Sequence, residues 1–166
     1  QNVDFDASNT SNLVIGKSAF KGNLHELRIW EDVRTKDEIT AHMSQKLAGT
    51  EPGLYGYWPM DEGRGNVARD KVAARTAAVG ATWSLRPGGY SWEFTGTNHL
   101  IAPSANVTID KETDMTIEFW VYANMPQDSM TIFSNGIGRG QDAYVDSHSV
   151  MNCFIAQDGK LYLFSN

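Results

Sequence analysis

Cysteine is almost absent from this chain of 166 residues, which contains a single one, Cys153. One thiol cannot form a disulfide within the chain, and it excludes a zinc cluster held by several thiolates. The neighbours of Cys153 in the run SVMNCFIA are mostly apolar. We therefore expect Cys153 to be buried as a small hydrophobic side chain.

Long hydrophobic runs and an excess of basic residues are also missing. No stretch approaches the roughly 18 apolar residues of a membrane-spanning helix, so we expect no membrane insertion. The 14 lysines and arginines are outnumbered by 20 acidic residues, which gives a formal net charge of -6. Nucleic acid is therefore not an expected partner, since binding it requires a basic surface. Neither the H-E-x-x-H motif of zinc proteases nor the G-x-S-x-G motif of serine hydrolases occurs.

What the sequence does contain is a series of short runs rich in aromatic and β-branched residues, separated by Gly, Asn and Asp. These runs predict strands. They are Asn12–Gly16, Asn23–Trp30, Gly53–Met60, Tyr90–Phe94, Met115–Ala123, Met130–Asn135, Met151–Gln157 and Lys160–Ser165. In 23–30, strict alternation places His25, Leu27 and Ile29 on one face and Leu24, Glu26, Arg28 and Trp30 on the other. The Asp-Gly pair in 157–160 predicts a two-residue hairpin. Together they predict an all-β antiparallel sandwich.

One short α-helix is expected over residues 35–48. Thr35 and Glu38 form a capping-box pattern, and Ile39, Met43 and Leu47 recur every four residues. Gly49 follows as a suitable helix terminator. The region 61–83 is richer in small and polar residues, and it predicts a long ordered loop with a weak strand at 76–79.

Four segments, taken in order, resemble a known family. They are Phe20–Ile39, Gly49–Asp70, Tyr90–Pro103 and Asp114–Ala123, with the runs RIW, GLYGYW and DEG. They are similar to the laminin-G-like, concanavalin A-like jelly-roll domains of the pentraxin-related branch, which are common in bacterial surface proteins. The resemblance implies a jelly-roll sandwich in a secreted or cell-surface protein, with a glycan or a neighbouring protein module as partner.

The order of these segments carries a prediction about domains. In the family, the RIW strand and its helix close a domain, whereas the GLYGYW strand opens one. Residues 1–50 are therefore expected to end one module, and residues 51–166 to begin the next. The alternative is that 1–166 forms one permuted or trimmed sandwich. The family usually has Asp at the position of His25, and here we expect a neutral imidazole facing the core.

Calcium is the cofactor that the sequence suggests, since this cation prefers carboxylates and loop carbonyls. The glycine-rich run MDEGRGNVARD supplies Asp61, Glu62 and Asp70 as candidate ligands. The resemblance supports this expectation, because many modules of that family hold calcium at a rim. A second acidic loop contains Asp142 and Asp146.

A glycan site needs exposed aromatic rings beside hydrogen-bonding groups. The possible platforms are Trp83, Tyr90, Trp92, Trp120 and Tyr122. Among the ligand-binding residues we predict Trp83 and Tyr90, with Arg139 in a flexible loop as a polar contact.

Catalysis is not expected. Glycoside hydrolases on this fold need two carboxylates about 5–9 Å apart. In the run ETDMTIEF, Glu112 and Asp114 belong to a predicted turn and only Glu118 lies inside the following strand, where it shares an outward or concave face with Trp120 and Tyr122. The sequence therefore predicts a non-catalytic carbohydrate- or protein-binding adhesion module. A structural spacer is the alternative, and a fragment of a glycoside hydrolase is the third interpretation.

Overall fold

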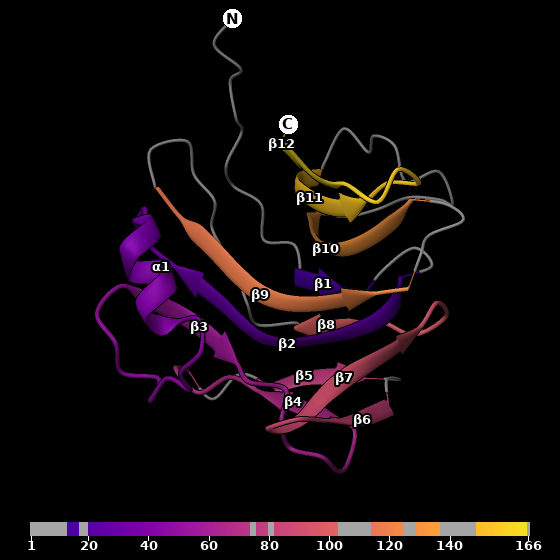
Figure 1. The fold of residues 1–166 in the computed structure, drawn as a ribbon, viewed down its shortest axis with the longest axis horizontal. Helices are drawn as coiled ribbons and strands as arrows, with labels where there is room; N and C mark the ends of the chain where they lie inside the picture. Colours follow the sequence, from indigo (N-terminus) through magenta and orange to yellow (C-terminus); the bar gives the residue numbers. More distant parts are fainter. Residues whose placement is uncertain are drawn as a thin grey trace, which may run out of the picture.

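The computed structural model describes residues 13–16, 20–73, 76–79, 82–102, 114–124, 129–136 and 149–165. Within these ranges the chain forms twelve strands and one short helix (Figure 1). The elements are β1 (Leu13–Ile15), β2 (Lys21–Trp30), α1 (Lys36–His42), β3 (Leu54–Trp58), β4 (Val67–Arg69), β5 (Thr76–Val79), β6 (Thr82–Arg86), β7 (Gly89–Thr95), β8 (Leu100–Ala102), β9 (Thr116–Ala123), β10 (Met130–Gly136), β11 (Ser149–Ile155) and β12 (Leu161–Ser165). The predicted all-β antiparallel sandwich with one helix is confirmed. In these residues no helix is long and apolar enough to cross a membrane.

The strands form two antiparallel sheets. The first has seven strands in the order β12-β11-β10-β1-β8-β5-β4. The second is built around β2, which pairs with β9 over residues 22–30 along one edge. Its other edge pairs with β7 over residues 21–24 and with β3 over residues 27–30. Figure 1 shows β2 and β9 as the two long curved strands that run side by side. Strand β2 is therefore an interior strand of the second sheet, with hydrogen-bonded neighbours along both of its edges.

The hydrophobic core lies between the two sheets. The first sheet contributes Ile15, Leu100 and Ile132, each with no exposed surface, and the second contributes Leu24 and Trp92, which are equally buried. Burial of such side chains stabilises the fold by about 1.5–3 kcal/mol each. Cys153 belongs to the same core at 3% exposure, and burial raises the pKa of its thiol to about 11. The prediction of a buried cysteine is confirmed.

A β-bulge in β2 overturns the alternation predicted for this strand. His25 pairs with Trp120 and Arg28 pairs with Glu118, so β2 holds one more residue than β9 between these pairs. Glu26 takes a positive φ of 57° at this point. The extra residue shifts the side-chain parity, so that Leu24 and Leu27 both face the core. His25 lies on the opposite, outer face of the sheet, which corrects the expectation that it faces the core.

The helix is shorter than the sequence indicates. Its start is as predicted, because the Thr35 side chain accepts from the Glu38 amide and the Glu38 carboxylate accepts from the Thr35 amide. It ends at His42, however, and not at residue 48. The carbonyls of His42 and Gln45 accept hydrogen bonds from the Arg28 guanidinium, and that of Met43 accepts from the Trp120 indole. Side chains of the sheet thus bind the carbonyl groups at the helix end and just beyond it.

The β11–β12 hairpin forms as predicted, but its turn is longer. The Ala156 amide donates to the Lys160 carbonyl, and the Gly159 amide donates to the Ala156 carbonyl. Three residues, 157–159, therefore make the loop, with Gly159 at a φ of 76°. The weak strand at 76–79 is present as β5, whereas the predicted loop around it also holds β4 and the start of β6.

Residues on both sides of position 50 share one sandwich. Strand β2 pairs with β3, β7 and β9, all of which follow position 50 in the chain. Strand β1 pairs likewise with β8 and β10. That this arrangement joins parts of two successive modules of a longer protein stays a prediction.

Candidate ligand-binding groove

The outer face of the second sheet is covered at one end and open at the other. Helix α1 and the segment after it cover the end of β2 that carries Arg28 and Trp30, which are each 1% exposed. The Arg34 guanidinium lies 4.1 Å from the centroid of the Trp30 ring, which adds to this cover. The cover stops near His25. From there the outer face of β2 and β9 lies open.

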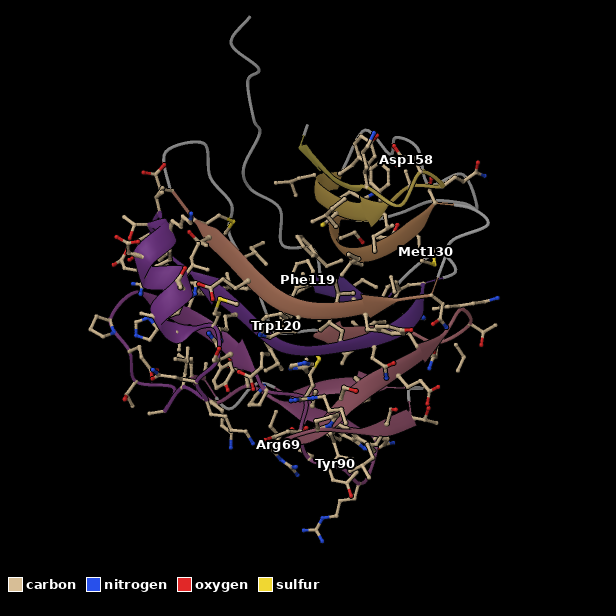
Figure 2. All side chains as sticks on the ribbon, in the orientation of Figure 1. Arg69, Tyr90, Phe119, Trp120, Met130 and Asp158 are labelled. Carbon is tan, nitrogen blue, oxygen red and sulfur yellow. The ribbon has the colours of Figure 1, made fainter. Side chains whose placement is uncertain are left out.

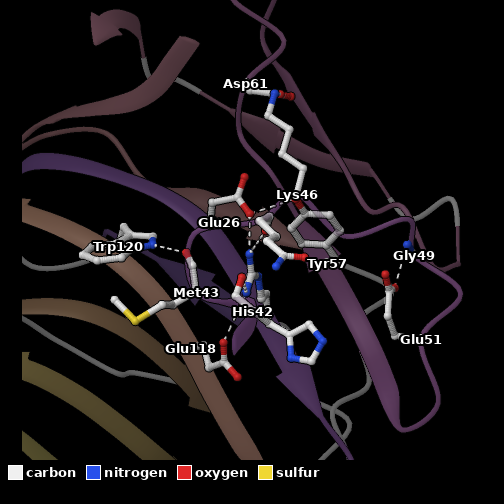
Figure 3. Close-up of polar contacts among 12 residues, drawn as sticks. Glu26, His42, Met43, Lys46, Gly49, Glu51, Tyr57, Asp61, Glu118 and Trp120 are labelled. Atoms are coloured by element: carbon white, nitrogen blue, oxygen red, sulfur yellow. Dashed lines mark hydrogen bonds and ion pairs between the residues drawn. The ribbon is translucent and has the colours of Figure 1, made fainter. Parts of the chain in front are cut away.

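A buried ionic cluster, formed by Glu26, Arg28, Tyr57 and Glu118, marks the border between the two ends (Figure 3). Arg28 donates to Glu26 at 2.8 Å and to Glu118 at 3.4 Å, and also to two backbone carbonyls. The Tyr57 hydroxyl donates to Glu26 at 2.8 Å. Burial, followed by the contact with Glu26, raises the pKa of Tyr57 well above its usual value. The cluster fixes the end of α1 to the sheet.

This cluster binds a second carboxylate, Glu26, to the same guanidinium as Glu118, and a glycoside hydrolase needs two carboxylates. Both carboxylates, however, bind the same guanidinium, and their side chains are only 8% and 11% exposed. Hydrolysis requires one of the two to donate a proton to the glycosidic oxygen. Carboxylates that accept hydrogen bonds from one buried cation are poorly placed for that role.

Two exposed aromatic side chains lie on the open end. Trp120 and Tyr122 alternate along β9 with Phe119 and Val121, which pack against the core. Trp120 is 42% exposed and Tyr122 is 71% exposed. The Trp120 indole donates to the Met43 carbonyl at 2.9 Å, so its ring is held in place (Figure 3). The exposed ring thus needs no ordering before a ligand binds to it.

Beside these rings the surface is hollowed in two adjoining places, which we call the groove. The first hollow, of about 340 Å³, has polar groups from Asn23, Ser84 and Ser91, and Tyr122 at its side. The second, of about 380 Å³, extends to the segment after α1 and includes Lys46. His25, Arg86 and Trp120 line both hollows.

His25 at the centre of the groove is a neutral imidazole. Burial, then the nearby charges of Arg86 and Arg28, lower its pKa from 6.5 to about 4. Its Nδ1 is buried without a hydrogen-bond partner, which disfavours the charged form further. The ring stacks in parallel beside Trp120, with 6.4 Å between the ring centroids. At neutral pH, therefore, His25 offers a flat uncharged surface.

Arg86 projects from the β6–β7 hairpin into the groove. Its Nε donates to the Tyr90 carbonyl at 2.9 Å, and a terminal nitrogen donates to the Pro87 carbonyl at 3.2 Å. Both partners are backbone groups of its own hairpin. Among the described residues, the salt bridges do not include Arg86.

The ligand-binding residues predicted from sequence lie elsewhere. Trp83 packs at 4.4 Å centroid distance against the core residue Trp92, and its indole donates to the Gly65 carbonyl. A Cβ on Gly63 would meet the Tyr90 ring at 2.5 Å, so this ring lies against the loop backbone. Figure 2 shows Trp120 over the middle of β9 and β2, whereas Tyr90 lies at the lower end of the molecule. Arg139 falls outside the described residues.

The three predicted calcium ligands have separate partners. Asp61 forms an ion pair with Lys46. One oxygen of Glu62 accepts from the Arg69 amide. Asp70 is 3% exposed and accepts from the backbone amides of residues 57, 72 and 73. In the part of the chain that the structure describes, no three His, Cys, Asp or Glu side chains gather as a metal site. Calcium binding stays a prediction, as does the acidic loop with Asp142 and Asp146, which is not described.

Sequence reasoning identified two of the groove residues only as general possibilities. The alternation of β9 places Trp120 and Tyr122 on an outward face, and that signal was available. His25 and Arg86 gave no comparable signal, because the first depends on the bulge and the second on a hairpin partner. Comparisons of the chain with protein-family models, with curated proteins and with solved structures found no match.

Proposed function

We propose that the chain is a non-catalytic carbohydrate-binding module, and that the groove is its binding site. The observation that carries the proposal is the pair of exposed rings, Trp120 and Tyr122, beside the polar groups that line the first hollow. The flat apolar face of a sugar ring packs on an aromatic side chain, while its hydroxyls need hydrogen-bonding partners. A hollow of this kind on a rigid sheet supplies both.

The order already present in the groove favours binding. Trp120 is fixed by its hydrogen bond to Met43 and by its parallel contact with His25. A ligand therefore loses little affinity to the ordering of side chains. The floor is formed by paired strands, so the spacing between the rings and the polar groups is set by the sheet. This is the reason to place the site here and not on a loop.

Direct binding measurements test the proposal. The full 166-residue chain is labelled and applied to an array of neutral and acidic oligosaccharides, and the strongest ligand is then titrated by calorimetry. Trp120→Ala is expected to reduce the affinity tenfold or more, which corresponds to about 1.4 kcal/mol. Tyr122→Ala is expected to reduce it less, because that ring is more exposed.

Two aromatic or apolar residues on the other sheet provide matched controls. Tyr162 is 42% exposed, as Trp120 is, and Leu163 is 66% exposed, close to Tyr122. Tyr162→Ala and Leu163→Ala are expected to leave glycan affinity unchanged. If no oligosaccharide binds, or if the control variants lose as much affinity as Trp120→Ala, the proposal is wrong. Absence of all binding would favour the structural spacer.

A further inference from the structure

The groove contains a cation, Arg86, that has no carboxylate partner among the described residues. The guanidinium of Arg86 lines both hollows, and the hydrogen bonds it makes within the described part of the chain go to the backbone carbonyls of residues 87 and 90. The charge of this half-buried arginine is therefore open to a ligand, although the chain as a whole has a net charge of -6. An arginine fork matches the geometry of carboxylate and sulfate groups.

Three acidic side chains in or beside the groove are bound to other groups. Glu26, in the second hollow, accepts from Arg28 and from the Tyr57 hydroxyl. Glu118, two residues before Trp120, is held by Arg28. Asp61 is paired with Lys46 at the edge of the second hollow.

Glu93 follows two residues after Ser91, which lines the first hollow, on β7. It is exposed, and its side chain accepts a hydrogen bond from the Thr82 hydroxyl at 3.2 Å. It pairs across the sheet with Asn23 and does not line either hollow. The low pKa of His25, to which the charge of Arg86 contributes, is consistent with a positive potential at the centre of the groove.

We infer that the groove selects acidic saccharides, with Arg86 binding an anionic group of the ligand, either a uronate carboxylate or a sulfate ester, while a sugar ring packs on Trp120. The inference rests on the proposed carbohydrate-binding function and narrows its ligand class. His25 beside Arg86 is uncharged at neutral pH. The positive charge for an anionic group of the ligand therefore comes from Arg86.

The test compares matched pairs of probes that differ only in charge. Trigalacturonate is titrated against its methyl ester, and a heparin-derived tetrasaccharide against its desulfated form. The acidic member is expected to bind at least tenfold more tightly, since hydrogen bonds to charged groups contribute about tenfold to a hundredfold in affinity. Its affinity is also expected to fall as sodium chloride is raised, because salt screens exposed charges.

Two variants of Arg86 and one control variant test the role of its charge. Arg86→Gln is expected to remove the preference for the acidic probe, and Arg86→Lys to keep part of it. Arg69→Gln changes an exposed arginine on β4, outside the groove, and is expected to have no effect. Equal binding of charged and uncharged probes, or an unchanged preference in Arg86→Gln, overturns this inference. If neutral probes still bind and need Trp120, the proposed function survives; if no probe binds, both are wrong.

Discussion

The buried guanidinium of Arg28 allows a quantitative prediction for the second sheet. Arg28 is 1% exposed and satisfies two carboxylates, Glu26 and Glu118, together with two carbonyls at the end of α1. Arg28→Met removes the cation and leaves both carboxylates buried without it. Breaking a buried ion pair from one side costs about 3–5 kcal/mol. Since domains of this size are stable by about 5–15 kcal/mol, we expect the free energy of unfolding to fall by a large fraction.

The measurement is urea unfolding followed by tryptophan fluorescence, with a compensated variant beside the single one. In Glu26→Gln/Arg28→Met/Glu118→Gln no charge is left buried, so at least half of the lost stability is expected to return. The single variant is also expected to recover as the pH is lowered, because burial raises the pKa of an unpaired carboxylate and protonation then removes its charge.

Lys160 provides the control, since its ion pair with Asp158 spans a similar 3.2 Å but is exposed to solvent. Lys160→Met is expected to change stability by less than about 1 kcal/mol. A loss of less than 1 kcal/mol in Arg28→Met, or a triple variant less stable than the single one, would refute the reasoning.

Three further predictions follow from other parts of the structure. Gly22→Ala is expected to lower the melting temperature by several degrees, because a Cβ there would meet the Tyr122 carbonyl oxygen at 2.1 Å; thermal unfolding checks this, and unchanged stability would mean that β2 and β9 are not so close. The pKa of His25 is lowered to about 4 in the folded chain, so its neutral form contributes fully to the free energy of unfolding above pH 6.5. This contribution is lost as the pH falls towards 4. Relative to His25→Gln, about 1–2 kcal/mol is expected to disappear over this window in pH-dependent urea unfolding, the value being reduced for partial exposure; parallel curves for the two proteins would contradict it. Calcium binding at Asp61, Glu62 and Asp70 is tested by melting the chain in calcium and in EDTA: a site saturated about 100-fold adds about 2.7 kcal/mol, a rise of roughly 5–10 °C, and an unchanged melting temperature would contradict it.

Much of the fold follows from local patterns in the sequence. The strand of 116–123 alternates apolar with polar or aromatic residues, and it occurs as predicted because one of its faces packs on the core. The capping box of Thr35 also forms, since it depends only on residues three positions apart. The bulge at Glu26 could not be predicted in the same way. It depends on where β7 ends and β3 begins beside β2, and this is a property of the assembled sheet.

The groove was harder to predict for the same reason. A tryptophan on a strand can face the core or the solvent. The alternation of residues along a strand shows which side chains share a face, but it does not show which strands lie beside that face. The sequence predicts Trp83, and not Trp120, as a ligand-binding residue. In the β6–β7 hairpin, however, Trp83 pairs with Trp92 and packs towards the core. Arg86 comes near His25 only because β7 joins β6 to β2. The groove brings together residues that are far apart in sequence, and the spacing of residues within one strand cannot predict such contacts.

The most direct test of the carbohydrate-binding groove is a proton–nitrogen NMR titration of the labelled chain with the strongest oligosaccharide from the array. The indole N–H of Trp120 and the backbone amides of residues 23, 25 and 91 are expected to shift together and to saturate. The indole of Trp83 is expected to stay in place. Shifts gathered instead at Trp83 and Tyr90, beside the 61–70 loop, would place the site at the rim and contradict the account, as would the absence of any saturable shift.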